Sequence, residues 1–272
     1  MAIPTVNVSE VDLPLYQKLP AFWKLKASPV ILRPLDGGKS GAGVFVVQVS
    51  PKDGPSEDAL IFGEYVLKFD AISKWAPAEP VEWQRHEAAR RRNPVFGEDH
   101  IPPLIRHAEL DGRIAMLYDI AGSSLASFVT ASAVENQGAL LKQLRRISMA
   151  MLDNLNPQRE DKPGVAAREI LETILGYRLD GTEGRALHDF VLAEYGGAAS
   201  TVIAGRVMAN ALQFCSNSVI REDASRVMYL GLLHGDLHLG NILLDKARPD
   251  SREFWVIDFA LSAIGPIGYD HS

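Results

Sequence analysis

Apolar residues in the first 120 positions alternate with polar ones or form short runs, a pattern that predicts a sheet. Residues 44–49 and 59–69 are rich in β-branched and aromatic side chains, and a turn-forming segment separates them. Residues 104–110 and 113–119 flank the dipeptide Asp111-Gly112, which is typical of a tight hairpin. Two antiparallel hairpins are therefore predicted.

One helix is predicted within the same region. Pro80 precedes the helical stretch 81–92, and Pro94 follows it closely, so proline marks both ends. The first 120 residues are therefore predicted to form a small antiparallel sheet with one helix.

The apolar spacing after Gly122 becomes mostly helical until short strands return near the C-terminus. The predicted helices cover residues 124–131, 135–155, 166–177, 184–195 and 201–220, and the predicted strands lie within 231–236, 241–245 and 253–260. The fold class expected is α+β, with one domain at 1–120 and a mostly helical one at 121–272.

Composition narrows the class of protein. Apolar residues make up 47% and charged residues 23%, as in ordinary globular proteins, and the formal net charge of -6 disfavours a chain-wide nucleic-acid surface. Cys215 is the single cysteine, which excludes an intramolecular disulfide and suits a reducing compartment. No apolar run approaches the roughly 18 residues of a membrane span. We expect a cytoplasmic protein that binds neither nucleic acid nor membrane.

The residues with the most specific spacing lie near the C-terminus. Asp236, Asn241 and Asp258 fall on loops beside short apolar strands, with the asparagine five positions after the first aspartate. Phosphoryl transfer from a nucleotide needs a carboxylate near the attacking hydroxyl and oxygen ligands for magnesium. A kinase catalytic loop supplies them as an Asp, an Asn five positions later and a second Asp on the next hairpin. The alternative is a purely structural role, in which Asp236 and Asn241 end a strand and cap a turn.

The string HGDLHLGN at 234–241 resembles the HGDxHxxN motif of the aminoglycoside and choline phosphotransferases, a branch of the protein-kinase-like fold. The resemblance implies a two-lobed kinase-like fold and a transfer that uses ATP (or GTP) and Mg²⁺. Asp236 would then be the catalytic base, and Asn241 and Asp258 the magnesium ligands. His234 and His238 would shape the loop, because two histidines alone do not make a zinc site.

The same hypothesis predicts a lysine and a glutamate upstream. Lys68 stands among apolar residues in a strand, and Glu87 follows 19 positions later on the predicted helix. We expect Lys68 to contact the nucleotide phosphates and Glu87 to hold it. Glu79 and Glu82 are rivals that lie at or before the first helical turn. Alternatively, Lys68 extends its ammonium into water.

A glycine-rich segment at 35–46 precedes the first hairpin strand. Glycines let main-chain amides approach phosphate oxygens, so Ser40, Gly41 and Gly43 are candidate nucleotide contacts. The segment is not a P-loop, since position 33, where the leading glycine would be needed, is Arg33. A plain tight turn is the alternative.

The segment MLYDIAGSSL resembles the hinge between the lobes of kinase-like folds. By that resemblance the main chain near Tyr118 and Ile120 would read the adenine, with Leu117 behind it. The same sequence is also compatible with an ordinary strand that leads into a helix.

Two departures qualify the resemblance. Ala260 occupies the position of the glycine in the kinase DFG motif, and 14 residues follow Asp258 where small-molecule members continue into acceptor-binding helices. We expect a domain of a longer protein, with other domains as partners and a small molecule or protein hydroxyl as acceptor; the alternative is that the predicted helices between Ser124 and Ile220 form the acceptor site alone. A nucleotide-binding pseudokinase and a nucleotidyltransferase remain alternatives.

Overall fold

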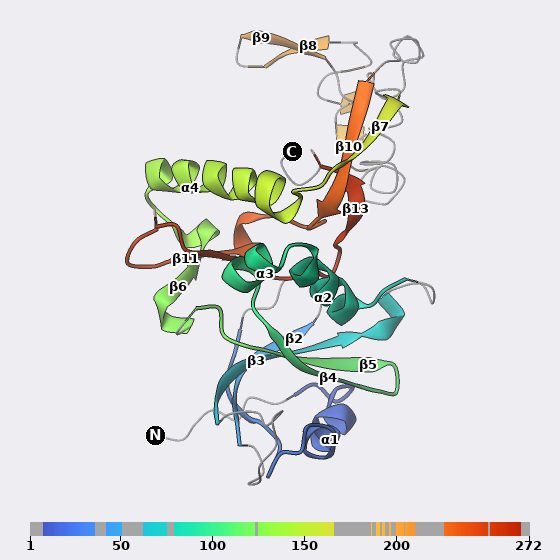
Figure 1. Ribbon diagram of the computed structural model, residues 1–272, viewed down its shortest axis with the longest axis vertical. Coiled ribbons are helices and arrows are strands. Elements are labelled where there is room, and N and C mark those ends of the chain that lie inside the picture. Colours follow the sequence, from blue (N-terminus) through green and yellow to red (C-terminus); the bar gives the residue numbers. More distant parts are fainter. Residues whose placement is uncertain are drawn as a thin grey trace. The chain divides into compact units, whose positions relative to one another are not determined.

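The computed structural model (Figure 1) describes most of the chain and divides it into two compact units. The residues described are 8–35, 42–50, 62–74, 79–122, 125–165, 186, 189–190, 192–193, 196, 200–203, 205–209, 226–249 and 251–267. Unit 1 comprises residues 1–155 and 234–262, and unit 2 comprises 156–233 and 263–272. The boundary expected at residue 120 lies inside unit 1.

A five-stranded antiparallel sheet forms the N-terminal part of unit 1, in the order β1-β2-β3-β5-β4. Its strands are β1 (Val30–Pro34), β2 (Gly43–Val49), β3 (Gly63–Ala71), β4 (Leu104–Leu110) and β5 (Arg113–Tyr118). Both predicted hairpins are present. Asp111 and Gly112 take φ values of 50° and 74°, the left-handed conformation that a tight hairpin turn requires.

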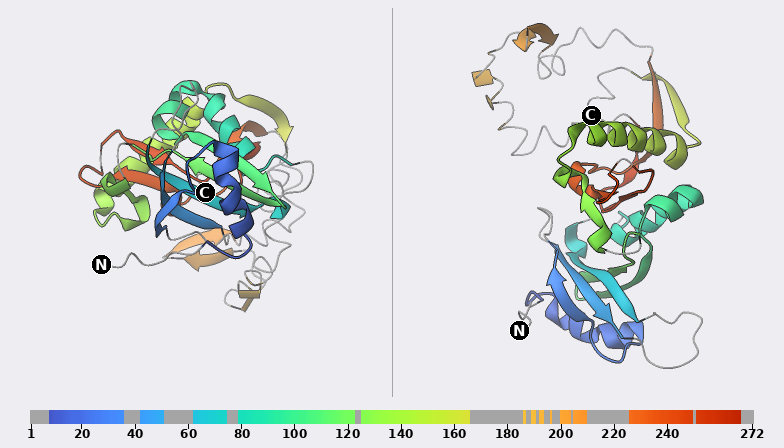
Figure 2. Two further views of the ribbon diagram at one scale, coloured as in Figure 1. Left: turned by 90° about the horizontal axis from the view of Figure 1, so that it is seen from below. Right: turned by 90° about the vertical axis from the view of Figure 1, so that its left-hand side faces the viewer.

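Helix α1 (Leu13–Trp23) lies across one face of this sheet (Figure 2). Leu15, Leu19 and Trp23 of α1 share a buried cluster with Leu67 and Phe69 of β3. Because side chains alternate along a strand, the intervening Lys68 points to the opposite face. The packing of α1 therefore decides which face of β3 is available to the lysine.

Three helices accompany this sheet, where the sequence predicted one. The predicted helix is α2 (Glu82–Arg92), and α1 and α3 (Pro94–His100) were not expected. Pro94 does end α2, but it also begins α3, whose first turn is capped when the Asn93 side chain accepts a hydrogen bond from the Val95 amide. Gly97 packs against the Arg90 carbonyl, where a Cβ would approach to 2.2 Å.

The rest of unit 1 contains a second antiparallel sheet and one long helix. The sheet order is β12-β11-β6, built from β6 (Phe128–Thr130), β11 (Ile242–Asp245) and β12 (Phe254–Val256). Helix α4 (Gln137–Ala150) continues into a π-helical turn at Met151–Leu155, as the helix predicted over 135–155 requires. Short 3-10 turns occupy Leu125–Ser127, Ala131–Ala133 and Leu239–Asn241.

The strands of unit 2 form two groups, and its described residues 186, 189–190 and 192–193 are helical. One sheet has the order β13-β10-β7, from β7 (Glu160–Val165), β10 (Arg226–Leu233) and β13 (Ala263–Pro266). A separate hairpin joins β8 (Ser200–Ile203) to β9 (Arg206–Ala209).

A mostly helical C-terminal part is therefore not supported. Residues 125–133 form a strand between two 3-10 turns instead of a helix. The first part of the helix predicted over 201–220 is instead the β8–β9 hairpin. The helix predicted at 166–177 lies outside the described residues, and within the one predicted at 184–195 the described residues 186, 189–190 and 192–193 are helical. No helix in the described ranges is long and apolar enough to cross a membrane.

Candidate active site

Lys68 is the buried cation at the centre of the candidate site. Its Nζ lies 2.8 Å from Glu82 Oε1 and 2.9 Å from Asp258 Oδ1, so it joins carboxylates that are 14 and 190 positions away in sequence. Burial alone would lower the pKa of Lys68, but the two carboxylates outweigh burial and raise it. The lysine is therefore charged, and the alternative of an ammonium in open water does not apply.

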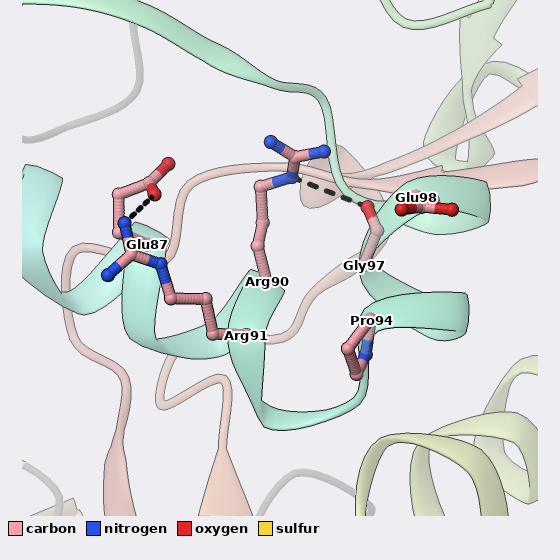
Figure 3. A pocket seen from close by; sticks show the side chains of 6 residues that line it. All are labelled: Glu87, Arg90, Arg91, Pro94, Gly97 and Glu98. Atoms are coloured by element: carbon pink, nitrogen blue, oxygen red, sulfur yellow. Dashed lines mark hydrogen bonds and ion pairs between the residues drawn. The ribbon is translucent and has the colours of Figure 1, made fainter.

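The partner of Lys68 on α2 is Glu82, which corrects the prediction of Glu87. Glu82 is the first residue of α2 and is buried. Glu87 pairs with Arg91 at 3.0 Å and lines a surface pocket of about 240 Å³ together with Arg90 (Figure 3). Five residues at 3.6 per turn separate the two glutamates by about 140° around the helix, so they cannot both face β3.

The signal that identifies Glu82 was present in the sequence. Glu82, His86 and Ala89 follow the spacing i, i+4, i+7, and these are the buried residues of α2. Glu87 falls on another face, where it pairs with the exposed Arg91. The inward spacing that Glu82 shares with His86 and Ala89 therefore distinguishes it from Glu87.

The Glu82 carboxylate has two different oxygen environments. Oε1 accepts hydrogen bonds from Lys68 and, at 3.2 Å, from the Tyr118 hydroxyl, while Oε2 is buried without a hydrogen-bond partner among the described residues. Burial raises the pKa of Glu82, and Lys68 opposes that rise. Burial, with the nearby Glu82 charge, also raises the pKa of Tyr118, which therefore stays a hydrogen-bond donor.

Asp258 lies two residues after β12 and has a φ of 65°. Burial would raise the pKa of its carboxyl, but the charge and hydrogen bond of Lys68 lower it. The side chain keeps 35% of its surface exposed, so the ionised carboxylate can reach a ligand. Within the described residues the left-handed conformation occurs at Asp258 and not at Ala260. This turn does not need the DFG glycine, and the alanine is compatible with it.

The loop 234–241 is fixed to the segment before Asp258 by hydrogen bonds. The His234 ring lies with Nε2 2.8 Å from the Ile257 carbonyl, and its Nδ1 accepts from the Asp236 amide at 3.3 Å. Because Nδ1 accepts from the Asp236 amide, Nε2 carries the proton that the ring donates to the Ile257 carbonyl. The His238 ring accepts from the Gly240 amide at 3.0 Å. Both histidines therefore shape the loop, as predicted.

Asn241 and Asp236 differ in burial. Asn241 is buried, and its side-chain Nδ2 donates to the main-chain carbonyl of Asp236 at 3.0 Å. Its main-chain carbonyl accepts from the Ile257 amide at 3.0 Å. Its Oδ1 accepts no hydrogen bond from the part of the chain that the structure describes. The Asp236 carboxylate is 51% exposed, and its Oδ2 lies 3.9 Å from His238 Nε2.

Gly235 sets the approach of this loop to the segment that follows Asp258. Its φ is 84°, and a Cβ at this position would lie 2.2 Å from the Leu261 carbonyl oxygen. Phe259, fully buried, adds side-chain contacts, with its ring 4.6 Å from that of His234 and 6.0 Å from that of His86 on α2. Backbone and ring packing thus hold the two loops together.

Comparison with protein families matches the phosphotransferase enzyme family, APH, over residues 32–271. The chain belongs to this family. The matched range contains Lys68, Asp258 and the loop 234–241, called the HGD loop below, so the ion pairs described above fall inside it. The comparison with curated proteins found no significant match. Membership makes the protein a kinase-like phosphotransferase and agrees with the resemblance of its HGDLHLGN motif.

The remaining residues predicted for this phosphotransferase site are only partly described. Ser40 and Gly41 lie outside the described residues, and Gly43 is the first residue of β2, paired with Phe69. The Ile120 amide donates to the Asp119 carboxylate at 2.8 Å. Tyr118 ends β5 and contributes its hydroxyl to the Lys68–Glu82 pair, a role that sequence reasoning missed because it considered only the main chain there.

A magnesium ion fits the donor set of Asn241 and Asp258. Mg²⁺ prefers hard oxygen ligands, takes few of them from the protein and completes its shell with water and phosphate. An ionised carboxylate and an amide oxygen without a hydrogen bond meet that requirement. No group of three or more His, Cys, Asp or Glu side chains suited to a metal occurs in the described ranges.

Proposed function

We propose that this phosphotransferase transfers the terminal phosphate of ATP or GTP to a hydroxyl acceptor with the help of Mg²⁺. The observation that carries the proposal is the placement of one buried lysine within 2.9 Å of Asp258 and 2.8 Å of a helix glutamate. A lysine that binds nucleotide phosphates must already be in position when they bind, and the two carboxylates provide that positioning.

Each side chain has a separate task in the proposed reaction. Glu82, in place of the predicted Glu87, holds Lys68, and the Lys68 ammonium neutralises phosphate charge. Asp258 and Asn241 hold Mg²⁺, which when bound supplies further neutralisation of the polyphosphate. Asp236 accepts the proton of the acceptor hydroxyl and orients its oxygen. Because its carboxylate is exposed, it is accessible to the acceptor.

The charges of the site support a metal requirement. Lys68 carries one positive charge, whereas Glu82 and Asp258 are carboxylates in direct contact with it. Polyphosphate brought to this cluster would be repelled by the surplus of negative charge unless a divalent cation came with it. The proposal therefore expects nucleotide to bind as its magnesium complex.

The acceptor is proposed to be a small molecule. A net charge of -6 mildly favours a cationic one, such as an aminoglycoside or a choline-like alcohol. This substrate class rests on the family and on charge, and Asp236 is the residue that would contact its hydroxyl.

Incubation with γ-labelled and with α-labelled ATP, in the presence of Mg²⁺ and a panel of such alcohols, tests the proposal. Label from the γ position is expected on the acceptor, and Asp236→Asn is expected to abolish that transfer while leaving ATP binding intact. Transfer of the α label would indicate nucleotidyl transfer instead. Tight binding of ATP without transfer of either label to any acceptor would favour a pseudokinase, and transfer retained by Asp236→Asn would remove the proposed base.

A further inference from the structure

Arg85 connects α2 to the segment that follows Asp258. Its guanidinium uses all three nitrogens: Nε donates to the Pro80 carbonyl at 2.7 Å, one terminal nitrogen to Glu79 at 3.1 Å, and the other to the Ser262 carbonyl at 2.9 Å. The side chain is 13% exposed. The first two acceptors are local to the start of α2, whereas Ser262 is 177 positions away.

The segment 258–262 is compact and is held on its other side by the HGD loop. The Ser262 amide donates to the Phe259 carbonyl at 3.0 Å, which closes a turn, and Ser262 is buried. Backbone contact between Gly235 and Leu261 fixes the opposite side. The Arg85 bond to Ser262 is thus the hydrogen bond that fastens this turn to α2 among the described residues.

Three residues on one side of α2 act on the same small region. Glu82 contacts Lys68, which contacts Asp258, while the His86 ring packs against Phe259. Arg85 lies three positions after Glu82, so both side chains fall on neighbouring parts of the helix surface. A movement of α2 would therefore move Lys68 and the Asp258 turn together.

We propose that Arg85 is a positioning residue that sets the Asp258 carboxylate for magnesium by holding the turn 258–262 on α2. The inference rests on the proposed function, because it takes Asp258 as a metal ligand. An arginine suits the task, since its planar guanidinium donates in several fixed directions at once, which the single ammonium of a lysine cannot do.

Hydrogen exchange of the peptide covering residues 257–262 gives a test that does not depend on activity. Arg85→Lys keeps the positive charge and the helix but loses the fork of donors, and it should raise exchange in this peptide roughly tenfold, as expected for one hydrogen bond to a charged group. Glu79→Gln removes only the local ion pair, and Arg91→Gln changes an exposed pair on the same helix. Both controls should leave the exchange unchanged. Equal exchange in Arg85→Lys and wild type would overturn the proposal.

Titration of ATP binding with Mg²⁺ gives the second readout. Arg85→Lys should need roughly tenfold more Mg²⁺ than wild type for half-maximal stimulation, with little change in ATP affinity measured without metal. An unchanged Mg²⁺ requirement would contradict the positioning role. If wild type shows no Mg²⁺-dependent binding, the proposed function fails, and the exchange experiment still decides whether Arg85 holds the turn. Melting temperatures within a few degrees of wild type exclude loss of fold as the cause.

Discussion

Lys68 and its two carboxylates show how much of a site depends on the surroundings of single side chains. A lysine buried without a partner would lose its proton, yet contact with Glu82 and Asp258 raises the pKa of this one. The order of Lys68, Asp236, Asn241 and Asp258 along the chain predicts four candidate residues, and Lys68 and Asp258 are in contact in the structure. The separation from Lys68 does not distinguish Glu82 from Glu87, whereas the inward spacing of Glu82, His86 and Ala89 along α2 does.

Exchange of the two glutamates for glutamine should have unequal effects. Glu82→Gln leaves the buried Lys68 with one carboxylate and should cost about 2 kcal/mol of unfolding free energy. Glu87→Gln breaks a surface pair whose arginine is 79% exposed, and such pairs contribute about 0–1 kcal/mol. Urea unfolding measures both values, and a larger loss in Glu87→Gln would return the role to that residue.

The pH dependence of stability should report on His86. Burial lowers the pKa of this ring to about 4, while its Nε2 lies 2.8 Å from the Pro102 carbonyl. An unfolded histidine has a pKa of about 6.5, so the unfolded chain binds more protons between pH 4 and 6.5 and the fold loses stability as the pH falls through that range.

Comparison with His86→Gln isolates this contribution. The raised pKa of Glu82 acts in the opposite direction, but it does so in both proteins. Denaturation at pH 7 and pH 5 should therefore show a smaller loss in the variant, with the difference reaching about 2 kcal/mol. Identical pH profiles would mean that His86 does not titrate on unfolding.

At the scale of elements, local signals gave the hairpins and tertiary packing gave the rest. Asp111-Gly112 specifies its own turn, and prolines delimit α2. Residues 128–130 were predicted as part of a helix, but Val129 and Thr130 pair with Leu244 and Leu243 of β11. That pairing joins segments more than 100 positions apart, so the helical spacing of their neighbours could not reveal it.

Gly235→Ala tests the close packing of the HGD loop on the Asp258 segment. The alanine would meet both a φ of 84° and the Leu261 carbonyl, whereas Gly112→Ala meets a φ of 74° with no atom within 4 Å. The Gly112 variant should therefore lose only the backbone term of about 1–2 kcal/mol, and the Gly235 variant clearly more. Unfolding free energies measure the difference. Equal losses would show that the loop has room to move away.

At the scale of the whole molecule, the family and the kinase-like class followed from the sequence, but the division into units did not. Unit 1 is built from two separate stretches of the chain, and the 78 residues between them (156–233) belong to unit 2. The contacts within unit 1 therefore join parts that no sequence boundary marks. Composition and periodicity cannot predict that a unit is made of two separate stretches. The HGD motif could be recognised because its residues are adjacent, whereas the partners of Lys68 are distant.

Magnesium-dependent binding of ATP is the most direct test of the central claim that Lys68, Asn241 and Asp258 form one metal–nucleotide site. Isothermal titration of wild type with ATP, with and without Mg²⁺, should show an affinity at least roughly tenfold higher with the metal. Asp258→Asn should abolish that difference, and the exposed surface variant Arg91→Gln should retain it. Equal ATP affinity in wild type with and without Mg²⁺, or an intact magnesium effect in Asp258→Asn, would contradict the account.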